Sequence, residues 1–311
     1  MPEVASLHPV LAAAVAPAWL LLGAWVVAAV DGVTGRLVAG HPVRGVLVEP
    51  LRVAARVMAQ RAVPTERPDA MSWLLAPACY AALSAAGLSV VPLGEGVAIA
   101  DVRTGIVFFG AAEALALVAV FLHGWAPNSH LSLLGGYRFV ALGLSYELLS
   151  MFVLIAAALP AESLQVSAIV RSQSELWNVV RQPLGLPLWI VVTLGVTFWG
   201  PLDLADGRDA AGGTSVEASG RQRLVWELAR RGMLVVFAAM GAAVFLGGWL
   251  GPVLPGWAWM AIKTLGLVVL TTWVGHRVGR VPSDRIVPIL WTVLLPLAFL
   301  GLAQAGWQAL P

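Results

Sequence analysis

The chain has 311 residues, of which 59% are hydrophobic and 12% are charged, and its formal net charge is +2. Soluble proteins carry charge on about a quarter of their residues, so this composition excludes a soluble globular protein. Several apolar runs are long enough to cross ~30 Å of hydrocarbon, which predicts a polytopic membrane protein embedded in a lipid bilayer. We expect no nucleic-acid partner.

Eight apolar runs are candidate membrane spans, and the whole chain, 1–311, is interpreted as a single membrane domain. The runs cover residues 9–30, 70–93, 103–123, 133–159, 183–200, 224–250, 256–275 and 286–309. Lipid offers the backbone no hydrogen-bond partners, and the runs lack the alternation of barrel strands, so we expect helices. The predicted fold class is therefore all-α, with about eight transmembrane helices. No basic region precedes the first run, so we expect it to remain as an anchor.

Most basic residues lie on one side of this arrangement. The connections after the first, third, fifth and seventh spans hold fourteen of the nineteen Lys and Arg residues, whereas the other connections hold three. Basic connections stay in the cytoplasm. We therefore place the odd-numbered connections in the cytoplasm and both termini on the outer face of the inner (plasma) membrane.

Residues 44–62 form a charged segment within the first connection. Val48, Leu51, Ala55 and Met58 recur at helical spacing, and arginines interrupt the apolar run. The segment is too charged to cross lipid, so the pattern predicts an amphipathic helix on the cytoplasmic membrane surface. It serves either as a linker or as a lid over a site.

Two charged residues interrupt the fourth span. Glu147 lies near its centre, and Gly136, Gly143 and Ser150 share a helix face with it, so a neighbouring helix can approach closely there. Arg138 lies on the opposite side, ~13 Å nearer the cytoplasm. Ionised groups inside lipid cost at least ~2.5 kcal/mol and usually face the bundle interior. We assign Glu147 to an interior polar path, with helix–helix hydrogen bonding as the alternative, and Arg138 to a cytoplasm-facing pocket.

Three further charges, Glu113, Glu227 and Lys263, lie in or near apolar runs. Glu113 either joins the polar path or sits protonated in a packed interface, and Lys263 can extend toward the outer interface. The five histidines and the single Cys79 show no metal-ligand spacing, and the chain has no phosphate-binding loop. We expect neither a metal site nor a catalytic side chain.

The segment HGWAPNSHLSLLGGYRFVALGLSYE, residues 123–147, resembles membrane subunit 1 of respiratory complex I, also called its H subunit, and the related subunit of membrane-bound hydrogenases. The shared residues, at the spacings of that family, are Gly124, Trp125, Asn128, Ser129, Leu134, Gly135, Arg138, Ser145, Tyr146 and Glu147. The resemblance extends over nearly the whole chain, including residues 43–61, 200–220 and 280–296.

The resemblance implies an eight-helix subunit that docks the hydrophilic iron–sulfur subunits beside the other membrane subunits of a complex I-like assembly. It implies a quinone chamber that includes Arg36, Glu49, Arg138, Asp203 and Asp206. It implies a proton path that includes Glu113, Tyr146, Glu147, Glu217 and Glu227, and structural interface residues Lys263, Arg280 and Asp284. Quinone is then a substrate and the chain binds no redox cofactor, so we expect no activity from the isolated subunit.

The loop around residues 196–210 departs from the family pattern. Val196, Phe198 and Trp199 stand where the family has an acid, an amide and a base, and Arg208 and Ala210 occupy glutamate positions. With fewer acids, the loop has less capacity to couple quinone reduction to proton transfer. Two alternatives stay open. One is the membrane anchor of a hydrogenase or formate-linked complex, which needs no quinone, and the other is a stand-alone transporter, whose paired repeats are not found in the sequence.

Overall fold

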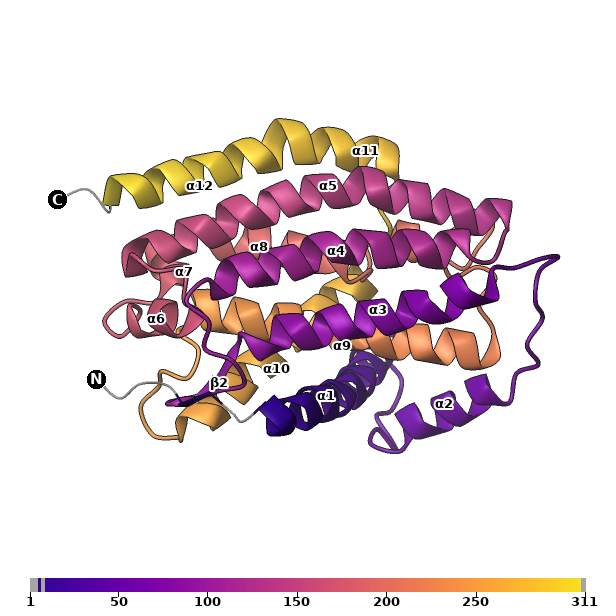
Figure 1. Ribbon diagram of the computed structural model, residues 1–311, viewed down its shortest axis with the longest axis horizontal. Helices are drawn as coiled ribbons and strands as arrows, with labels where there is room; N and C mark the ends of the chain where they lie inside the picture. The colour runs from indigo at the N-terminus through magenta and orange to yellow at the C-terminus, as the bar shows by residue number, and fades with distance from the viewer. Residues whose placement is uncertain (1–4, 7–8, 309–311) are drawn as a thin grey trace.

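Long helices that lie side by side dominate the computed structural model, which describes residues 5–6 and 9–308 (Figure 1). Seven helices in these ranges are long and apolar enough to cross a membrane. They are α1 (Pro9–Val38), α3 (Ala70–Ser89), α4 (Gly105–Trp125), α5 (His130–Ala158), α9 (Gly220–Phe245), α10 (Gly256–Arg277) and a last helix made of α11 (Ser283–Ile289), η3 (Leu290–Leu294) and α12 (Leu295–Gln308). The predicted class, an all-α polytopic membrane protein, is confirmed.

The eighth apolar run, expected over 183–200, forms a much shorter helix. Helix α8 (Gly185–Val196) has 12 residues, so it is ~18 Å long and cannot cross ~30 Å of hydrocarbon alone. It ends where the chain turns, since Phe198 adopts a left-handed backbone with φ of 57°. Two short helices, α6 (Val166–Arg171) and α7 (Asn178–Arg181), precede it. The eight expected apolar helices are therefore present among the described residues as seven long helices and one short helix, α8.

The expected location of both chain ends concerns residues 1–4 and 309–311, which lie outside the described residues. Elsewhere the helix bounds differ from the expected spans by several residues. Helix α1 continues to Val38, eight residues past the expected end, because the polar residues of its last turns still have helical partners: the Thr34 hydroxyl donates to the Val30 and Asp31 carbonyls.

The amphipathic segment forms α2 (Glu49–Met58), which is shorter than the expected 44–62 because residues 44–48 form turns. Pro50 lies in its first turn, where a missing N–H costs nothing. Leu51 and Met58 are more than half exposed, Arg56 is exposed, and Val57 is buried. A helix that exposes both apolar and basic side chains suits the boundary between lipid and water.

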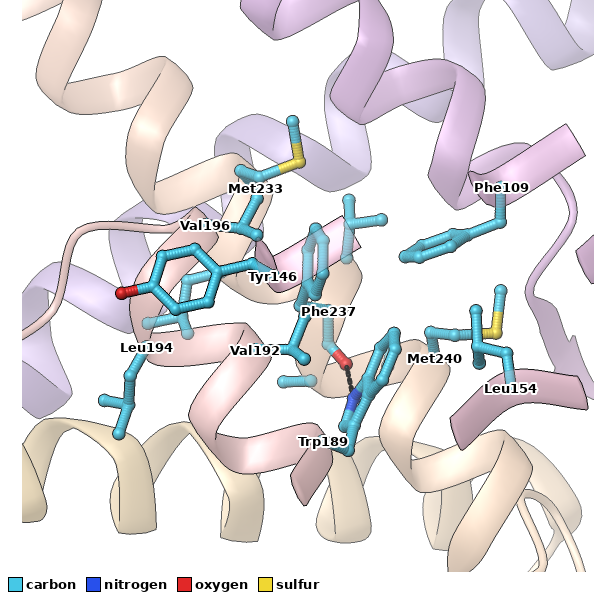
Figure 2. Packing of buried hydrophobic residues seen from close by; sticks show 14 of the residues in the cluster. Phe109, Tyr146, Leu154, Trp189, Val192, Leu194, Val196, Met233, Phe237 and Met240 are labelled. Atoms are coloured by element: carbon cyan, nitrogen blue, oxygen red, sulfur yellow. Dashed lines mark hydrogen bonds between the residues drawn. The ribbon is translucent and has the colours of Figure 1, made fainter. Parts of the chain in front are cut away.

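The core lies around α9. In its apolar 18-residue stretch 78% of the residues are buried, whereas in the corresponding stretch of the last helix 17% are buried. Aromatic residues join the short helix α8 to this centre (Figure 2). The Trp189 indole Nε1 donates to the Phe237 carbonyl at 3.0 Å, and the two rings stack with centroids 5.3 Å apart. Phe109 of α4 meets Phe237 edge-on at 5.2 Å. These contacts pack both α8 and α4 against α9.

Helix α4 packs along the small-residue face of α5. A Cβ on Gly124 would lie 2.8 Å from the Ser132 carbonyl and 3.0 Å from the Gly136 Cα, so glycine allows the two backbones to approach closely. Farther along, Gly143 faces Leu117 of α4. The neighbour expected for this face is therefore α4.

A small sheet, which the sequence analysis does not anticipate, lies at the end of the bundle opposite α2 (Figure 1). Its order is β1 (Ala5–Ser6), β3 (Val97–Ala98) and β2 (Pro92–Gly94), with β1 parallel and β2 antiparallel to β3. Two residues, Glu95 and Gly96, join β2 to β3, and Gly96 takes the positive φ of 70° that such a tight loop favours. Strands of two or three residues are too short for periodicity to predict.

Candidate functional site at the α2 end of the bundle

The end of the bundle that carries α2 is called here the α2 end (Figure 1). Charged side chains gather there and form ion pairs with one another. Many belong to the loop of residues 197–219, which joins α8 to α9 and contains η2 (Asp203–Asp206). Others come from the first turns of α9, from α2, and from the ends of α1 and α10. Segments far apart in the sequence therefore supply one polar region.

Asp206 is a buried hydrogen-bond acceptor at the centre of this region. Its side chain is 1% exposed, and its carboxylate accepts hydrogen bonds from Thr214 Oγ1 at 2.9 Å, from Trp226 Nε1 at 2.9 Å and from the Ser215 hydroxyl. The Arg230 guanidinium pairs with it at 3.2 Å. Buried carboxylates require such partners, since an unpaired one costs several kcal/mol. Asp206 therefore ties the loop to α9.

Glu227, one helical turn before Arg231, is the second buried acid and has three arginine partners. Its side chain is 5% exposed, and its carboxylate meets Arg208 Nη2 and Arg223 Nε, each at 2.8 Å, and Arg231 Nη2 at 3.4 Å. Burial lowers the pKa of the Arg208 guanidinium, while the Glu227 and Asp206 carboxylates oppose that change. Three guanidinium groups on one carboxylate leave a surplus of positive charge at this site.

A cavity of about 400 Å³ opens between α1, α2 and α9. Its charged lining consists of Asp31, Glu49, Glu227 and Arg231, and the rest is mostly apolar. A second cavity, of about 340 Å³, lies between α1, α3 and α9 and has an almost wholly apolar lining. Both are lined by Leu21 and Leu228, so they adjoin. Together they form an amphipathic space, called here the α1–α9 cavity, with a polar part near α2 and an apolar part within the helices.

Three contacts fix the charges beside the α1–α9 cavity. Glu49 of α2 meets Arg56 at 2.7 Å and Arg36 of α1 at 3.6 Å, so the ion pair joins α2 to α1. Asp31 of α1 meets Nε2 of His276, near the end of α10, at 2.8 Å. Arg56 is exposed, whereas the other four side chains, those of Asp31, Arg36, Glu49 and His276, are each about one-third exposed or less.

Arg138 anchors the 197–219 loop instead of lining the α1–α9 cavity. Its Nη1 donates to the carbonyls of Ala211 at 2.5 Å and Gly212 at 2.8 Å. One turn earlier on α5, Gly135 lies so close to Gly213 and Thr214 that a Cβ on Gly135 would overlap their backbone. Helix α5 and the loop are therefore in direct backbone contact.

Asp203 and Glu217, two other predicted acids, also hold this loop, and so does Asp209, which the sequence analysis does not single out. Asp203 meets the Arg280 guanidinium at 2.7 and 3.0 Å, and Asp209 meets the same group at 2.6 Å. These bonds raise the pKa of Arg280, with Asp203 the largest cause, and Arg280 holds the pKa of Asp209 below its usual range. Glu217 accepts a hydrogen bond from Ser129 Oγ at 2.6 Å.

The predicted proton-path residues of α4 and α5 lie deeper in the bundle. Glu113 is buried, and its Oε2 accepts a hydrogen bond from Ser150 Oγ at 2.6 Å. Glu147, one turn before Ser150, is partly buried and close enough to Glu113 for their charges to interact. Tyr146 is buried against Gly195 of α8, and its hydroxyl has no partner among the described residues (Figure 2).

The predicted interface residues lie elsewhere. Lys263 is buried near the opposite end, where Nζ donates to the carbonyls of Gly248 at 2.9 Å and Leu250 at 2.6 Å and lies 4.2 Å from the Trp177 ring centroid. Asp284 is exposed in the first turn of α11. Within residues 5–6 and 9–308, no group of three or more His, Cys, Asp or Glu side chains is placed to hold a metal ion.

The structure thus divides the predicted residues among several places. Glu49 and Glu227 line the α1–α9 cavity, and Arg36 pairs with Glu49. Asp206 lies under the loop, and Glu113 and Glu147 lie along the α4–α5 contact. The sequence analysis does not single out Asp31, Arg231 or His276, and Asp31 and His276 are partners that lie far apart in the sequence. The one available signal is Asp31, an acid near the end of an otherwise apolar helix.

Known proteins resemble this chain over most of its length. The sequence model of the NADH dehydrogenase family matches residues 7–305. The chain is 32% identical over 252 residues to the first H subunit of NADH-quinone oxidoreductase in Rhodopseudomonas palustris strain HaA2, which covers 81% of this chain and 79% of that protein. It is 30% identical over 303 residues to the NADH-quinone oxidoreductase H subunit of Syntrophotalea carbinolica, which covers 93% and 92%. It is also 30% identical to the second H subunit of NADH-quinone oxidoreductase in Geobacter sulfurreducens, over 84% of this chain and 82% of that protein.

Proposed function

Because the chain belongs to the NADH dehydrogenase family, with relatives that are H subunits of NADH-quinone oxidoreductase, we propose that it forms part of the quinone chamber of a complex I-like oxidoreductase. The α1–α9 cavity carries this proposal. A quinone has a polar ring with two carbonyl oxygens and a long apolar tail. The cavity offers a polar part beside Arg231 and an adjoining apolar part beside Leu21 and Leu228.

The α2 end faces the cytoplasm in this proposal and docks the hydrophilic iron–sulfur subunits. The asymmetry of Lys and Arg residues supports that orientation, with both termini outside. The loop of residues 197–219 is held in place by Asp206, Arg138 and Arg280, so it presents a defined surface to a partner. Electrons reach the quinone from a partner subunit, since the family role of this chain is that of a membrane subunit.

Glu113 and Glu147 are the proposed start of the proton path. They lie near one another along the α4–α5 contact, and the Ser150 hydroxyl holds one of them. Two neighbouring carboxylates in a region of low dielectric constant do not ionise independently, so a proton can be shared or exchanged between them. Tyr146 lies next to Glu147 in the chain, and its hydroxyl has no hydrogen-bond partner among the described residues.

Filling the polar part of the cavity tests the proposal. Gly32 of α1 lines the cavity, and a Cβ there would meet nothing within 4 Å, so the side chain of Gly32→Trp can leave the helix without a backbone clash and obstruct the cavity. Gly266 of α10 is equally open but lies outside the cavity, so Gly266→Trp is the matched control. The complex is purified from membranes through a tag on this chain and labelled with a photoreactive short-tailed quinone.

We expect labelling of peptides that contain residues 21–32 and 224–231, which an excess of unlabelled quinone prevents. Gly32→Trp should weaken quinone binding by at least about tenfold, which equals ~1.4 kcal/mol, and Gly266→Trp should not. If excess quinone does not compete for labelling of the wild-type complex, the chain is instead the anchor of a hydrogenase or formate-linked complex. If a purified monomer transports a solute in liposomes, the transporter alternative holds.

A further inference from the structure

His276 and Asp31 form a contact at the polar part of the α1–α9 cavity that the proposed function does not use. His276 Nε2 lies 2.8 Å from Asp31 Oδ1, and both side chains are about one-third exposed. The ring rests on α1 at Gly35, where a Cβ would lie 3.1 Å from its Cε1 atom. A side chain at position 35 would push the ring away from α1 by a few tenths of an ångström, so the glycine favours this contact between the two helices.

Arg231 faces the same cavity with unused hydrogen-bonding capacity. Its guanidinium meets Glu227 at 3.4 Å, a weak contact, and its buried Nε has no partner among the described residues. Asp31 is near enough for its charge to interact with Arg231. A carboxylate that is free to turn would take the strong bidentate geometry that arginine offers to carboxylates. The contact with His276 holds the Asp31 carboxylate on the α10 side.

We propose that His276 is a positioning residue that holds Asp31 away from Arg231, so that the Arg231 guanidinium is left to donate a hydrogen bond to a carbonyl oxygen of the bound quinone. This inference rests on the proposed function. A quinone carbonyl only accepts hydrogen bonds, so a guanidinium attracts it and a carboxylate repels it. The charge arrangement beside the cavity therefore decides how tightly the quinone ring binds.

The arrangement also makes binding depend on pH. Imidazole gains or loses its charge between about pH 5 and 8, and the charged ring binds Asp31 more strongly. At this end of the bundle the charged groups on the helices around it are Asp31 and Arg36 on α1, Arg221, Arg223, Glu227, Arg230 and Arg231 on α9, and Arg277 on α10. Of these, Asp31 contacts the ring. Acidification within this range should therefore strengthen the hold on Asp31 and tighten quinone binding.

The test measures quinone affinity by competition with the photoreactive quinone, on the whole complex, from pH 5.5 to 8. His276→Leu removes the contact, and His276→Gln keeps a neutral donor near the position of Nε2 as the conservative variant. Asp31→Asn removes the charge that competes for Arg231. Asp31→Asn combined with His276→Leu completes a double-mutant cycle, which separates the pairwise effect from general damage to packing.

We expect His276→Leu to weaken quinone binding about fivefold, the effect of ~1 kcal/mol, and to abolish the pH dependence. His276→Gln should retain most of the affinity without the pH dependence. Adding Asp31→Asn to His276→Leu should restore affinity, which a merely structural role of His276 does not predict. Unchanged affinity in His276→Leu, or no restoration in the double variant, would overturn the inference. Failure of any quinone to compete in the wild type would overturn the proposed function itself, and this inference with it.

Discussion

Ser150 and Glu113 join α5 to α4 inside the bundle: the serine hydroxyl donates to the glutamate Oε2 at 2.6 Å. This bond occupies one oxygen of a buried carboxylate, whose second oxygen, Oε1, has no partner among the described residues. Glu147 lies one turn before Ser150 on the same helix and is partly buried. A bound acid and a freer acid thus lie close together at the same contact between helices.

The first prediction concerns the freer acid. Glu147→Gln keeps the size of the side chain and removes its titration, so assembly of the complex should be unchanged. Proton translocation should fall by about tenfold or more, the usual effect of losing a positioned acid–base group. The measurement is proton uptake by the complex in proteoliposomes during quinone reduction. Glu95→Gln, in the exposed β2–β3 loop, is the control. Full coupling in Glu147→Gln would mean that Glu147 serves only in helix packing.

The second prediction concerns Arg208 and Ala210, the two loop positions where the family resemblance leads the sequence analysis to expect glutamate. Arg208 pairs with buried Glu227, so Arg208→Glu places a second carboxylate against it. Because Arg223 and Arg231 remain and Arg208 is about one-third exposed, we expect a loss of stability of ~1–3 kcal/mol. Ala210→Glu, at an exposed site two residues away, should be neutral in stability.

Thermal unfolding of the two purified complexes compares these variants. Equal midpoints for Arg208→Glu and Ala210→Glu would show that the Arg208–Glu227 pair contributes nothing measurable. The comparison also decides how to restore acids to the loop, since only Ala210 can accept one without breaking a buried ion pair.

The third prediction concerns orientation. Ala210, in the loop between α8 and α9, is exposed, and Val253, between α9 and α10, is 95% exposed. In a background in which the single cysteine Cys79 is replaced by serine, a membrane-impermeant maleimide should label Val253→Cys in intact cells. It should label Ala210→Cys only in inverted vesicles. The reverse pattern would invert the topology. Gly213 is unsuitable as a labelling site because it is buried against Gly135.

The fourth prediction concerns Lys263 at the end of the bundle opposite α2. Its ammonium group donates to two carbonyls just after α9 and lies over the Trp177 ring. Lys263→Met leaves both carbonyls without this donor, so we expect a loss of ~2–3 kcal/mol in stability. Thr264→Ala, on the next residue, is the control. Thermal unfolding of the complex measures the difference, and an unchanged midpoint for Lys263→Met would show that the capping contact is dispensable.

Sequence periodicity and hydropathy predict the long helices because each must bury its own backbone in lipid, whatever its neighbours are. They also predict that a helix approaches the face of Gly136 and Gly143, since small residues favour close packing. They do not predict the short α8, because an apolar run reveals neither the chain turn at Phe198 nor the packing of Trp189 on α9, which arise only in the folded protein.

The candidate site is predictable only in part for the same reason. The roles suggested for Asp206 and Glu227 depend on a family pattern, whereas their partners Arg230 and Arg208 are identified only by the path of the loop. Asp31 and His276 are separated by 245 residues, and a pair this distant has no signature in a single sequence. Arginines counted simply as cytoplasmic charge thus turn out to bind particular buried acids.

The tight contact between Gly135 and the backbone of Gly213 and Thr214 couples the position of the 197–219 loop to the position of α5. Gly135 itself has no side chain that could absorb a displacement at this point by changing its rotamer. A shift of the loop at this contact therefore displaces the α5 backbone directly. Glu147 lies twelve residues farther along the same helix, ~18 Å from the point of contact. A movement at the α2 end would therefore be transmitted to Glu147 through helix α5 alone, without a chain of charged residues between the loop and Glu147.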